Sequence, residues 1–307
     1  MKTQWMNLKL VLIGAILVPY FTFSQYNKCA AQNVITEERE EVYFDAVKGR
    51  EVIKKVEVPV AADSYGNPKG NQYDLAVDGA FEGQTIAVLH FYTGEGFDFE
   101  LPKNAMKEKG FSVYRWINNA PSVKDLEEGL KKSCQLWIIS DSYAKLSKEH
   151  IDVIKKFFDS GKGVYIWGDN QPYYADANAV ARALIGVEMS GNTMGAQVVN
   201  LQKENHKVGL IPNHLISTGI QNIYEGITIA TLQDHQDLTP LIYGSANNLV
   251  TAAYEKNGKR LILDGGFTRL YVNWDSAGTG RYVKNAAAWL VNYEKFGKEV
   301  VSEKVNK

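Results

Sequence analysis

Between residues 85 and 185 the chain alternates short apolar runs with amphipathic segments, and this pattern most constrains the fold. The expected strands are Thr85–Tyr92, Phe111–Ile117, Leu136–Ser140 and Gly163–Trp167. The expected helices are Leu101–Lys109, Ser122–Lys132, Ser147–Ser160 and Tyr173–Ile185. Strands joined through helices need crossover connections, which place helices on both faces of a parallel sheet. The pattern therefore predicts an α/β fold with a mostly parallel sheet.

The second half of the chain lacks this regular alternation of apolar runs and amphipathic segments. The sequence after Gly186 is polar and glycine-rich through Asn213, which is typical of an insertion. The short apolar runs that follow are separated by turn residues, which favours antiparallel pairing. These runs are Gly226–Leu232, Leu241–Tyr243 and Leu249–Tyr254. A turn at Lys256–Arg260 completes a late hairpin and leads into Leu261–Leu263, a strand that could share the parallel sheet with the four earlier strands. We expect a final helix over Gly280–Tyr293 and a frayed polar tail over residues 297–307.

The N-terminus is typical of an export signal. Lys2 and Lys9 precede the apolar run Leu10–Phe23, which is too short for a comfortable membrane span. We expect a signal peptide over residues 1–31, cleaved after residue 24 or 31, and hence a periplasmic or extracellular protein with no stable span. An uncleaved anchor and a lipoprotein attached at Cys29 are the alternatives.

Residues 32–83 are expected to form an extended arm and a linker before the main domain at 84–296. Charged and β-branched residues alternate over Glu51–Val58, which favours an outlying strand. Turn-forming residues crowd Asp63–Asn71. The formal net charge of −1 gives no electrostatic reason to expect nucleic acid as a partner. Cys29 and Cys134 could form a disulfide in an oxidising compartment. Cys134 begins an apolar segment, however, which favours a buried free thiol at that position.

Polar residues follow the expected strands where each strand ends. Ligands of open α/β sheets bind beyond these carboxyl ends, so we predict a binding edge there. Its candidate residues are Thr93, Glu95, Asp141, Asp169, Asn170, Asp264, Gly265, Gly266 and Arg269. Aromatic residues near the edge could stack on sugar rings or simply pack in the core: Tyr92, Tyr143, Tyr173, Tyr174, Tyr271 and Trp274.

Three segments resemble the class I glutamine amidotransferase-like superfamily, and especially its secreted ThuA-like members. These are the strand and turn at Gly163–Gln171, the segment His214–Ile220 and the hairpin leading into Arg260–Gly266. The resemblance covers roughly residues 84–296 and implies a flavodoxin-like sheet. Active amidotransferases carry a nucleophilic Cys in the turn, where this chain has Asp169 and Asn170, and the start of a strand is the wrong place for Cys134 to replace it.

These observations support three hypotheses. The first is an exported, catalytically degenerate domain that binds a small polar ligand, a glycan or a protein partner. The second is a hydrolase or isomerase that uses carboxylates or a metal on a sugar-like substrate, with Asp169, Asp141, Glu95 or Asp264 as acid, base or ligand. His90 is a further catalytic candidate, and a hydrogen-bonded core residue is the alternative for it. The third is a structural subunit of a cell-envelope complex that docks through the arm. The sequence indicates no cofactor and no fixed metal-ligand spacing.

Overall fold

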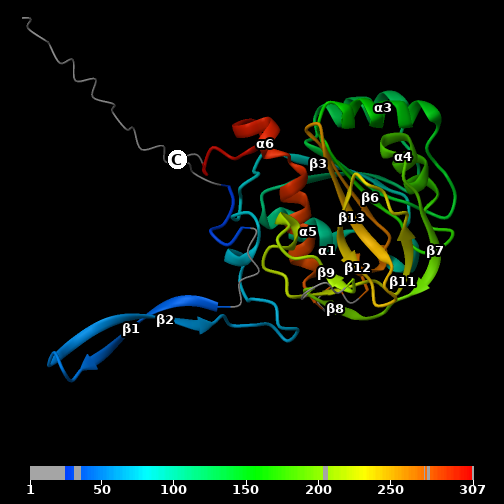
Figure 1. The fold of residues 1–307 in the computed structure, drawn as a ribbon. Coiled ribbons are helices and arrows are strands. Elements are labelled where there is room, and N and C mark those ends of the chain that lie inside the picture. Colours follow the sequence, from blue (N-terminus) through cyan, green and yellow to red (C-terminus); the bar gives the residue numbers. More distant parts are fainter. Residues whose placement is uncertain (1–24, 31–35, 203–206, 273, 275–276, 306–307) are drawn as a thin grey trace, which may run out of the picture.

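The computed structural model describes residues 25–30, 36–202, 207–272, 274 and 277–305 (Figure 1). Most of the expected signal peptide, residues 1–24 and 31, lies outside these ranges. No helix within them is both long and apolar enough to cross a membrane.

An eight-stranded sheet forms the centre of the molecule. Its spatial order is β4 (Ser112–Ile117), β3 (Thr85–His90), β5 (Gln135–Ile139), β6 (Gly163–Trp167), β14 (Lys259–Asp264), β13 (Leu249–Lys256), β12 (Leu238–Tyr243) and β9 (Gly209–Leu210). The first five are parallel and the last three antiparallel. If the five parallel strands are numbered 1 to 5 in chain order, their order across the sheet is 2-1-3-4-5, which is the flavodoxin-like order. The expected α/β fold is confirmed.

Helices cover both faces of the sheet. One face packs against α1 (Glu100–Glu108) and α5 (Thr279–Leu290), and the other against α2 (Val123–Lys131), α3 (Lys148–Asp159) and α4 (Ala175–Ile185). Ser122 caps α2, since its side chain accepts a hydrogen bond from the Asp125 amide. Strands β5 and β6 are buried at every position, as expected for strands covered on both faces.

Small antiparallel sheets lie outside the central sheet. Strand β7 (Met189–Met194) pairs with β11 (Thr228–Leu232), and β8 (Val198–Asn200) pairs with β10 (Asn222–Tyr224). The polar stretch after Gly186 thus contains the three short strands β7, β8 and β9. The antiparallel pairing expected for the later runs is found, although β11 joins β7 while β12 and β13 extend the central sheet.

The C-terminal tail is not frayed through Val305, contrary to expectation. After α6 (Tyr293–Phe296) comes a 3₁₀ turn over Gly297–Val300. Val300 and Val301 are buried in the core, and the Ser302 amide donates to the Ala80 carbonyl. The apolar pair within a polar run therefore ties the end of the chain to the domain.

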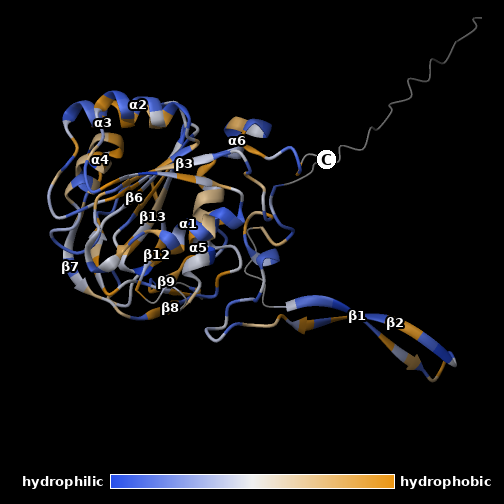
Figure 2. Cartoon of the chain, turned by 180° about the vertical axis from the view of Figure 1, so that it is seen from behind, coloured by the Kyte–Doolittle hydropathy of each residue, from blue (hydrophilic) through white to orange (hydrophobic). Residues whose placement is uncertain are grey.

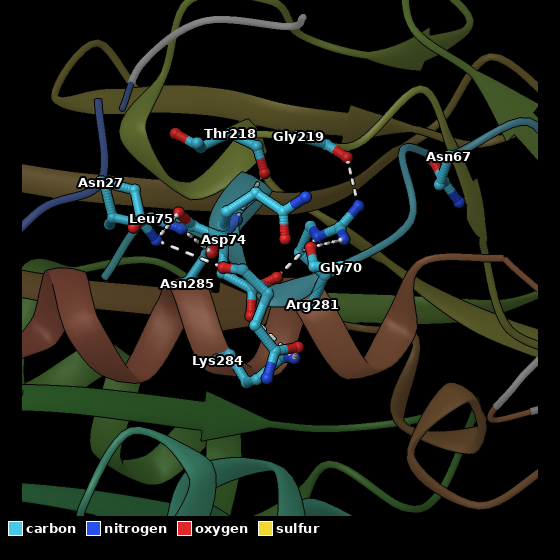
Figure 3. A network of polar contacts seen from close by, with 12 residues as sticks. Asn27, Asn67, Gly70, Asp74, Leu75, Thr218, Gly219, Arg281, Lys284 and Asn285 are labelled. Carbon is cyan, nitrogen blue, oxygen red and sulfur yellow. Dashed lines mark hydrogen bonds and ion pairs between the residues drawn. The ribbon is translucent and has the colours of Figure 1, made fainter. Parts of the chain in front are cut away.

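The segment before β3 is also built into the domain (Figure 3). The Asp74 carboxylate is fully buried and forms ion pairs with Lys109 at 2.8 Å, Lys284 at 2.8 Å and Arg281 at 2.7 Å. On the same helix as Lys284, buried Asn285 accepts a hydrogen bond from the Leu75 amide. These contacts fasten the segment around residue 74 to α5.

The expected arm is a β-hairpin that projects from the domain (Figure 1). It consists of β1 (Thr36–Asp45) and β2 (Arg50–Pro59), which pair with each other over their whole length. The Asp45 carboxylate accepts hydrogen bonds from the amides of Val47 and Lys48 and so shapes the turn. Figure 2 shows hydrophobic stretches on both strands.

The Cys29–Cys134 disulfide is not formed, because both cysteines are free and buried. Cys29 packs beside Val60 and Tyr73, whereas Cys134 precedes β5 in the main core. The plain burial favoured for Cys134 is confirmed.

We expect both thiols of the full chain to resist alkylation at pH 8 until the protein unfolds. Burial raises the pKa of Cys134 to about 12 and also raises that of Cys29, so little thiolate forms in the folded state. Mass spectrometry after iodoacetamide treatment should show no adduct in buffer and two in concentrated urea. Rapid labelling in buffer would contradict this account of the two sites.

Candidate functional site

The candidate site lies at the carboxyl ends of the parallel strands, on the face covered by α1 and α5. In a flavodoxin-like sheet the strand order reverses between the first and third strands, here β3 and β5, and ligands bind near that point. His90 ends β3, Ile139 ends β5 and Trp167 ends β6, and these residues share one row of the sheet. Side chains in one row point to the same face. Adjacent strands are about 4.8 Å apart, so His90 and Trp167 are separated by about 10 Å.

Four buried polar atoms around this edge make no hydrogen bond to any described residue. They are Nε2 of His90, Nε1 of Trp167, Oδ1 of Asp169 and Nε of Arg269. Buried polar atoms in native proteins nearly always have partners, and an orphaned one requires an explanation such as a bound molecule. Their gathering at the strand ends therefore points to a ligand position.

Asp169 is the central residue of the site. It follows Gly168 after β6, and its side chain is only 7% exposed. Burial raises the pKa of Asp169 to about 8, with smaller upward contributions from Asp264 and Glu95 that are opposed by the Asn170 amide and Arg269. Burial likewise lowers the pKa of His90 to about 4, helped by Arg115. At neutral pH the site therefore presents a mostly protonated carboxyl group and a neutral imidazole.

Aromatic rings cluster beside these groups. Phe97 lies 5.0 Å from the His90 ring and 5.0 Å from the Phe267 ring, measured between centroids. Tyr92 packs edge-on against Phe267 at 5.3 Å and against Tyr173 at 5.5 Å. The Tyr271 hydroxyl donates to the exposed Glu95 carboxylate at 3.1 Å. Phe97 and Phe267 are buried, so the aromatic rings that reach the surface of the site are those of Tyr92, Tyr173 and Tyr271.

Asp264 and Arg269 lie beneath the site and do not line its surface. Both are fully buried and form an ion pair at 3.1 Å. The Asp264 carboxylate also accepts hydrogen bonds from the hydroxyls of Tyr165 at 3.0 Å and Tyr282 at 3.3 Å. Gly265 is required here, because a Cβ atom would lie 2.0 Å from the Ala230 carbonyl oxygen. These residues hold the turn after β14 in place.

The remaining candidates are engaged elsewhere. The Asp141 carboxylate pairs with Lys145 at 2.8 Å, and Lys145 in turn lies over the Phe91 ring in the opposite half of the core. Asn170 accepts a hydrogen bond from the Thr228 hydroxyl at 2.7 Å. Thr93 is exposed and precedes the turn that carries Glu95. Gly266 approaches the Arg269 guanidinium so closely that a Cβ would lie 2.2 Å from it.

Sequence reasoning missed Trp167, Phe97 and Phe267 as site residues. A tryptophan that ends a buried strand looks like core, and only the lack of a partner for its indole N–H distinguishes it. The two phenylalanines each follow a glycine at a strand end, which is the signal that could have revealed them. Among the described residues, no group of three or more His, Cys, Asp or Glu side chains is placed to hold a metal ion.

Comparison with known proteins identifies no family for this chain. No family model and no curated protein matches its sequence. Among solved structures, a ThuA-like protein from Parabacteroides merdae ATCC 43184 superposes with a TM-score of 0.44 and 10% identity, over 68% of this chain and 90% of that one.

Two larger proteins give lower scores. Agd3, a carbohydrate deacetylase, has a TM-score of 0.40 and 12% identity, over 68% of this chain and 32% of that one. The exo-beta-1,4-mannosidase Op5Man5 from Opitutaceae bacterium strain TAV5 has a TM-score of 0.39 and 8% identity, over 68% and 36%. This chain therefore spans about a third of each of these two proteins.

Proposed function

We propose that the chain binds a sugar or a similar polyhydroxylated ligand at the edge formed by Asp169, His90 and Trp167. The observation that carries the proposal is the buried Asp169 carboxyl group, whose Oδ1 atom makes no hydrogen bond within the described part of the chain. A buried carboxyl group with one unpartnered oxygen destabilises the fold, so a ligand that supplies the missing partner offsets that cost.

A sugar fits the chemistry of this edge. Each hydroxyl group both donates and accepts, so a sugar hydroxyl can supply the missing partner of the Asp169 carboxyl group. The apolar face of a sugar ring can pack on aromatic residues such as Tyr271, whose hydroxyl also positions Glu95. The turn after β6 contains neither Cys nor Ser, so it offers no nucleophile for a covalent intermediate. This favours ligand binding over covalent catalysis at the site. We further propose that the domain is exported, on the basis of the apolar run Leu10–Phe23.

The proposal is tested by calorimetric titration with a panel of monosaccharides and β-1,4-linked gluco-, manno- and N-acetylglucosamine oligosaccharides. At least one should bind, and Asp169→Asn should weaken its binding by about tenfold to a hundredfold, because a hydrogen bond to a buried group is lost or altered. Asp141→Asn is the matched control and should bind as the wild type does. Binding that is unaffected by Asp169→Asn, or no binding across the panel, would contradict the proposal.

The raised pKa of Asp169 favours a second candidate function, acid–base hydrolysis. A carboxyl group that stays protonated near neutral pH is suited to donate a proton to a leaving group, and Glu95 supplies a second carboxyl group nearby. We propose aryl glycosides as the first substrates to test. Turnover by wild type that falls as the pH rises through about 8 and disappears in Asp169→Asn would support this candidate. Ligand binding without turnover would rule it out.

A further inference from the structure

The β1–β2 arm leaves two strand edges open. The two strands pair only with each other, and the Tyr73 hydroxyl fastens the base of the arm by donating to the Glu37 carboxylate at 3.0 Å. An isolated two-stranded hairpin is marginally stable in water, and an unpaired edge invites another strand. A partner strand would therefore stabilise the arm.

One face of the arm carries large apolar side chains near its tip. Val42, Phe44 and Ile53 are 62%, 65% and 66% exposed, and Val42 lies directly opposite Ile53. Side chains alternate along a strand, so Glu51 and Lys55 share this face with Ile53. The face thus presents an apolar centre on β2 with one charge of each sign beside it.

Charge distinguishes the two open edges. Strand β1 carries five acidic residues and one arginine, a net charge of −4, whereas β2 carries three basic and two acidic residues, a net charge of +1. Like charges opposite each other destabilise strand pairing, so two β1 edges repel. Pairing of a β1 edge with the β2 edge of another copy is favoured by charge, but it is a head-to-tail contact that does not close into a dimer. Two β2 edges related by a two-fold axis form a closed dimer, whose outer β1 edges repel further copies.

The sequence of β2 selects one register for antiparallel pairing with itself. With a two-fold axis at Ile53, Glu51 of each copy lies opposite Lys55 of the other, which gives two attractive cross-strand pairs. An axis at Val52 would place Arg50 opposite Lys54, and an axis at Lys54 would place Glu51 opposite Glu57; both are repulsive. An axis at Val56 would pair Lys55 with Glu57, but it would place Ile53 opposite Pro59 and so lose the central pair of isoleucines. A shift by an odd number of residues would put the two Ile53 side chains on opposite faces of the joined sheet.

We propose that two copies of the chain join edge to edge through β2, forming a four-stranded antiparallel sheet centred on Ile53. In this sheet the apolar side chains of the two arms form one stripe, flanked by the two Glu51–Lys55 pairs. The proposal does not depend on the ligand site, which lies in the domain.

The first test is a charge swap followed by sedimentation velocity over a range of protein concentrations. The wild type should form a dimer, and Glu51→Lys should weaken it by on the order of tenfold, because two attractive pairs become repulsive. Lys55→Glu should weaken it at least as much, because it also breaks the ion pair of Lys55 with Glu38 of the same arm at 3.0 Å. The double variant E51K/K55E regains both cross-copy pairs and should dimerise more strongly than Lys55→Glu. Glu57→Lys is the control. It makes the same change of charge as Glu51→Lys, but Glu57 lies opposite the uncharged Gly49 of the other copy, so the dimer should stay intact. A wild type that stays monomeric, or a double variant that is not rescued, would overturn the proposal.

The second test reads the register directly. Directly opposed Cα atoms in an antiparallel pair are about 4.5–5.5 Å apart, which a disulfide spans. Ile53→Cys should therefore yield a disulfide-linked dimer on mild oxidation. Lys55→Cys should not, since the two copies of that residue lie about 14 Å apart along the strands. Equal cross-linking at both positions would indicate random encounters and contradict the register. The native cysteines are buried and do not interfere.

Discussion

Replacing Asp169 with asparagine should make the folded chain more stable at pH 8, by about 3 kcal/mol, while it weakens ligand binding. A shift in the pKa of Asp169 from 3.8 to about 8 corresponds to a cost on the order of 5 kcal/mol for ionising the buried carboxyl group at high pH. The asparagine side chain avoids that cost, although its own buried amide loses about 1–3 kcal/mol for want of partners. A stabilising substitution that removes function is the signature of a binding residue.

The pH dependence of stability follows from the direction of this shift. Between pH 4 and 8 the unfolded chain has released the Asp169 proton while the folded chain still holds it, so folding becomes less favourable as the pH rises. We expect the wild type to lose up to about 1.4 kcal/mol per pH unit relative to Asp169→Asn across this window. Urea unfolding of both proteins at pH 5, 6.5 and 8 measures the difference, which should be small at pH 5 and largest at pH 8.

Asp141→Asn is the control for this experiment. Burial pushes the pKa of Asp141 up, but the hydrogen bonds from Lys145 and the Ser142 amide outweigh burial and hold that pKa below its ordinary value. The folded state therefore keeps Asp141 ionised throughout the window, and its variant should be less stable by a similar amount at each pH. Parallel curves for the wild type and Asp169→Asn would show that Asp169 is not a buried, unpartnered acid.

Removing the Asp74 carboxylate should destabilise the chain by about 3–5 kcal/mol, because breaking a buried ion pair leaves its partner charge uncompensated. Lys109 is fully buried and would keep only Asp78 as a partner, while Arg281 and Lys284 would lose their contact with the same carboxylate. We expect Asp74→Ala to lower the urea midpoint strongly. It should also expose the segment around residue 74 to proteolysis.

Asp78→Ala is the matched control for Asp74→Ala. Asp78 also pairs with Lys109, at 2.6 Å, but its side chain is 56% exposed. Removing Asp78 leaves the buried Lys109 charge paired with the buried Asp74 carboxylate, so this variant should lose clearly less stability than Asp74→Ala. Equal effects of the two substitutions would show that the buried network does not hold the segment to α5.

The sequence predicted elements well where both faces of the element are buried, because such an element is then almost entirely apolar. Strand β6 was predicted at its observed bounds, because the run from Val164 to Trp167 is apolar throughout. The N-cap of α2 was recognisable from Ser122. The hairpin form of the arm was not predicted, since its turn depends on the Asp45 side chain and not on a typical two-residue turn motif. The fixed tail was missed because Val300 and Val301 lie in an otherwise polar run.

The strand-end rule located the candidate site but did not rank its residues. It gave Asp169, Asp264 and Asp141 equal weight. In the structure Asp169 is buried without a hydrogen bond at Oδ1, Asp264 is buried in an ion pair with Arg269, and Asp141 is paired with Lys145. Asp141 and Asp264 each have a cationic residue four or five positions later in the sequence, Lys145 and Arg269, and this signal was not used. Asp169 has no such neighbour, but its burial depends on packing between segments distant in the sequence, about which strand periodicity carries no information. The orphaned groups could therefore be identified only in three dimensions.

The most direct test of the central claim is a crystal structure of the chain with a bound saccharide from the titration panel. We predict the sugar within hydrogen-bond distance of the Asp169 carboxyl group, at the carboxyl ends of β3 and β6, with a ring packed against the aromatic cluster that includes Phe97 and Tyr271. A saccharide bound elsewhere, with Asp169 Oδ1 still lacking a partner, would contradict the proposed site.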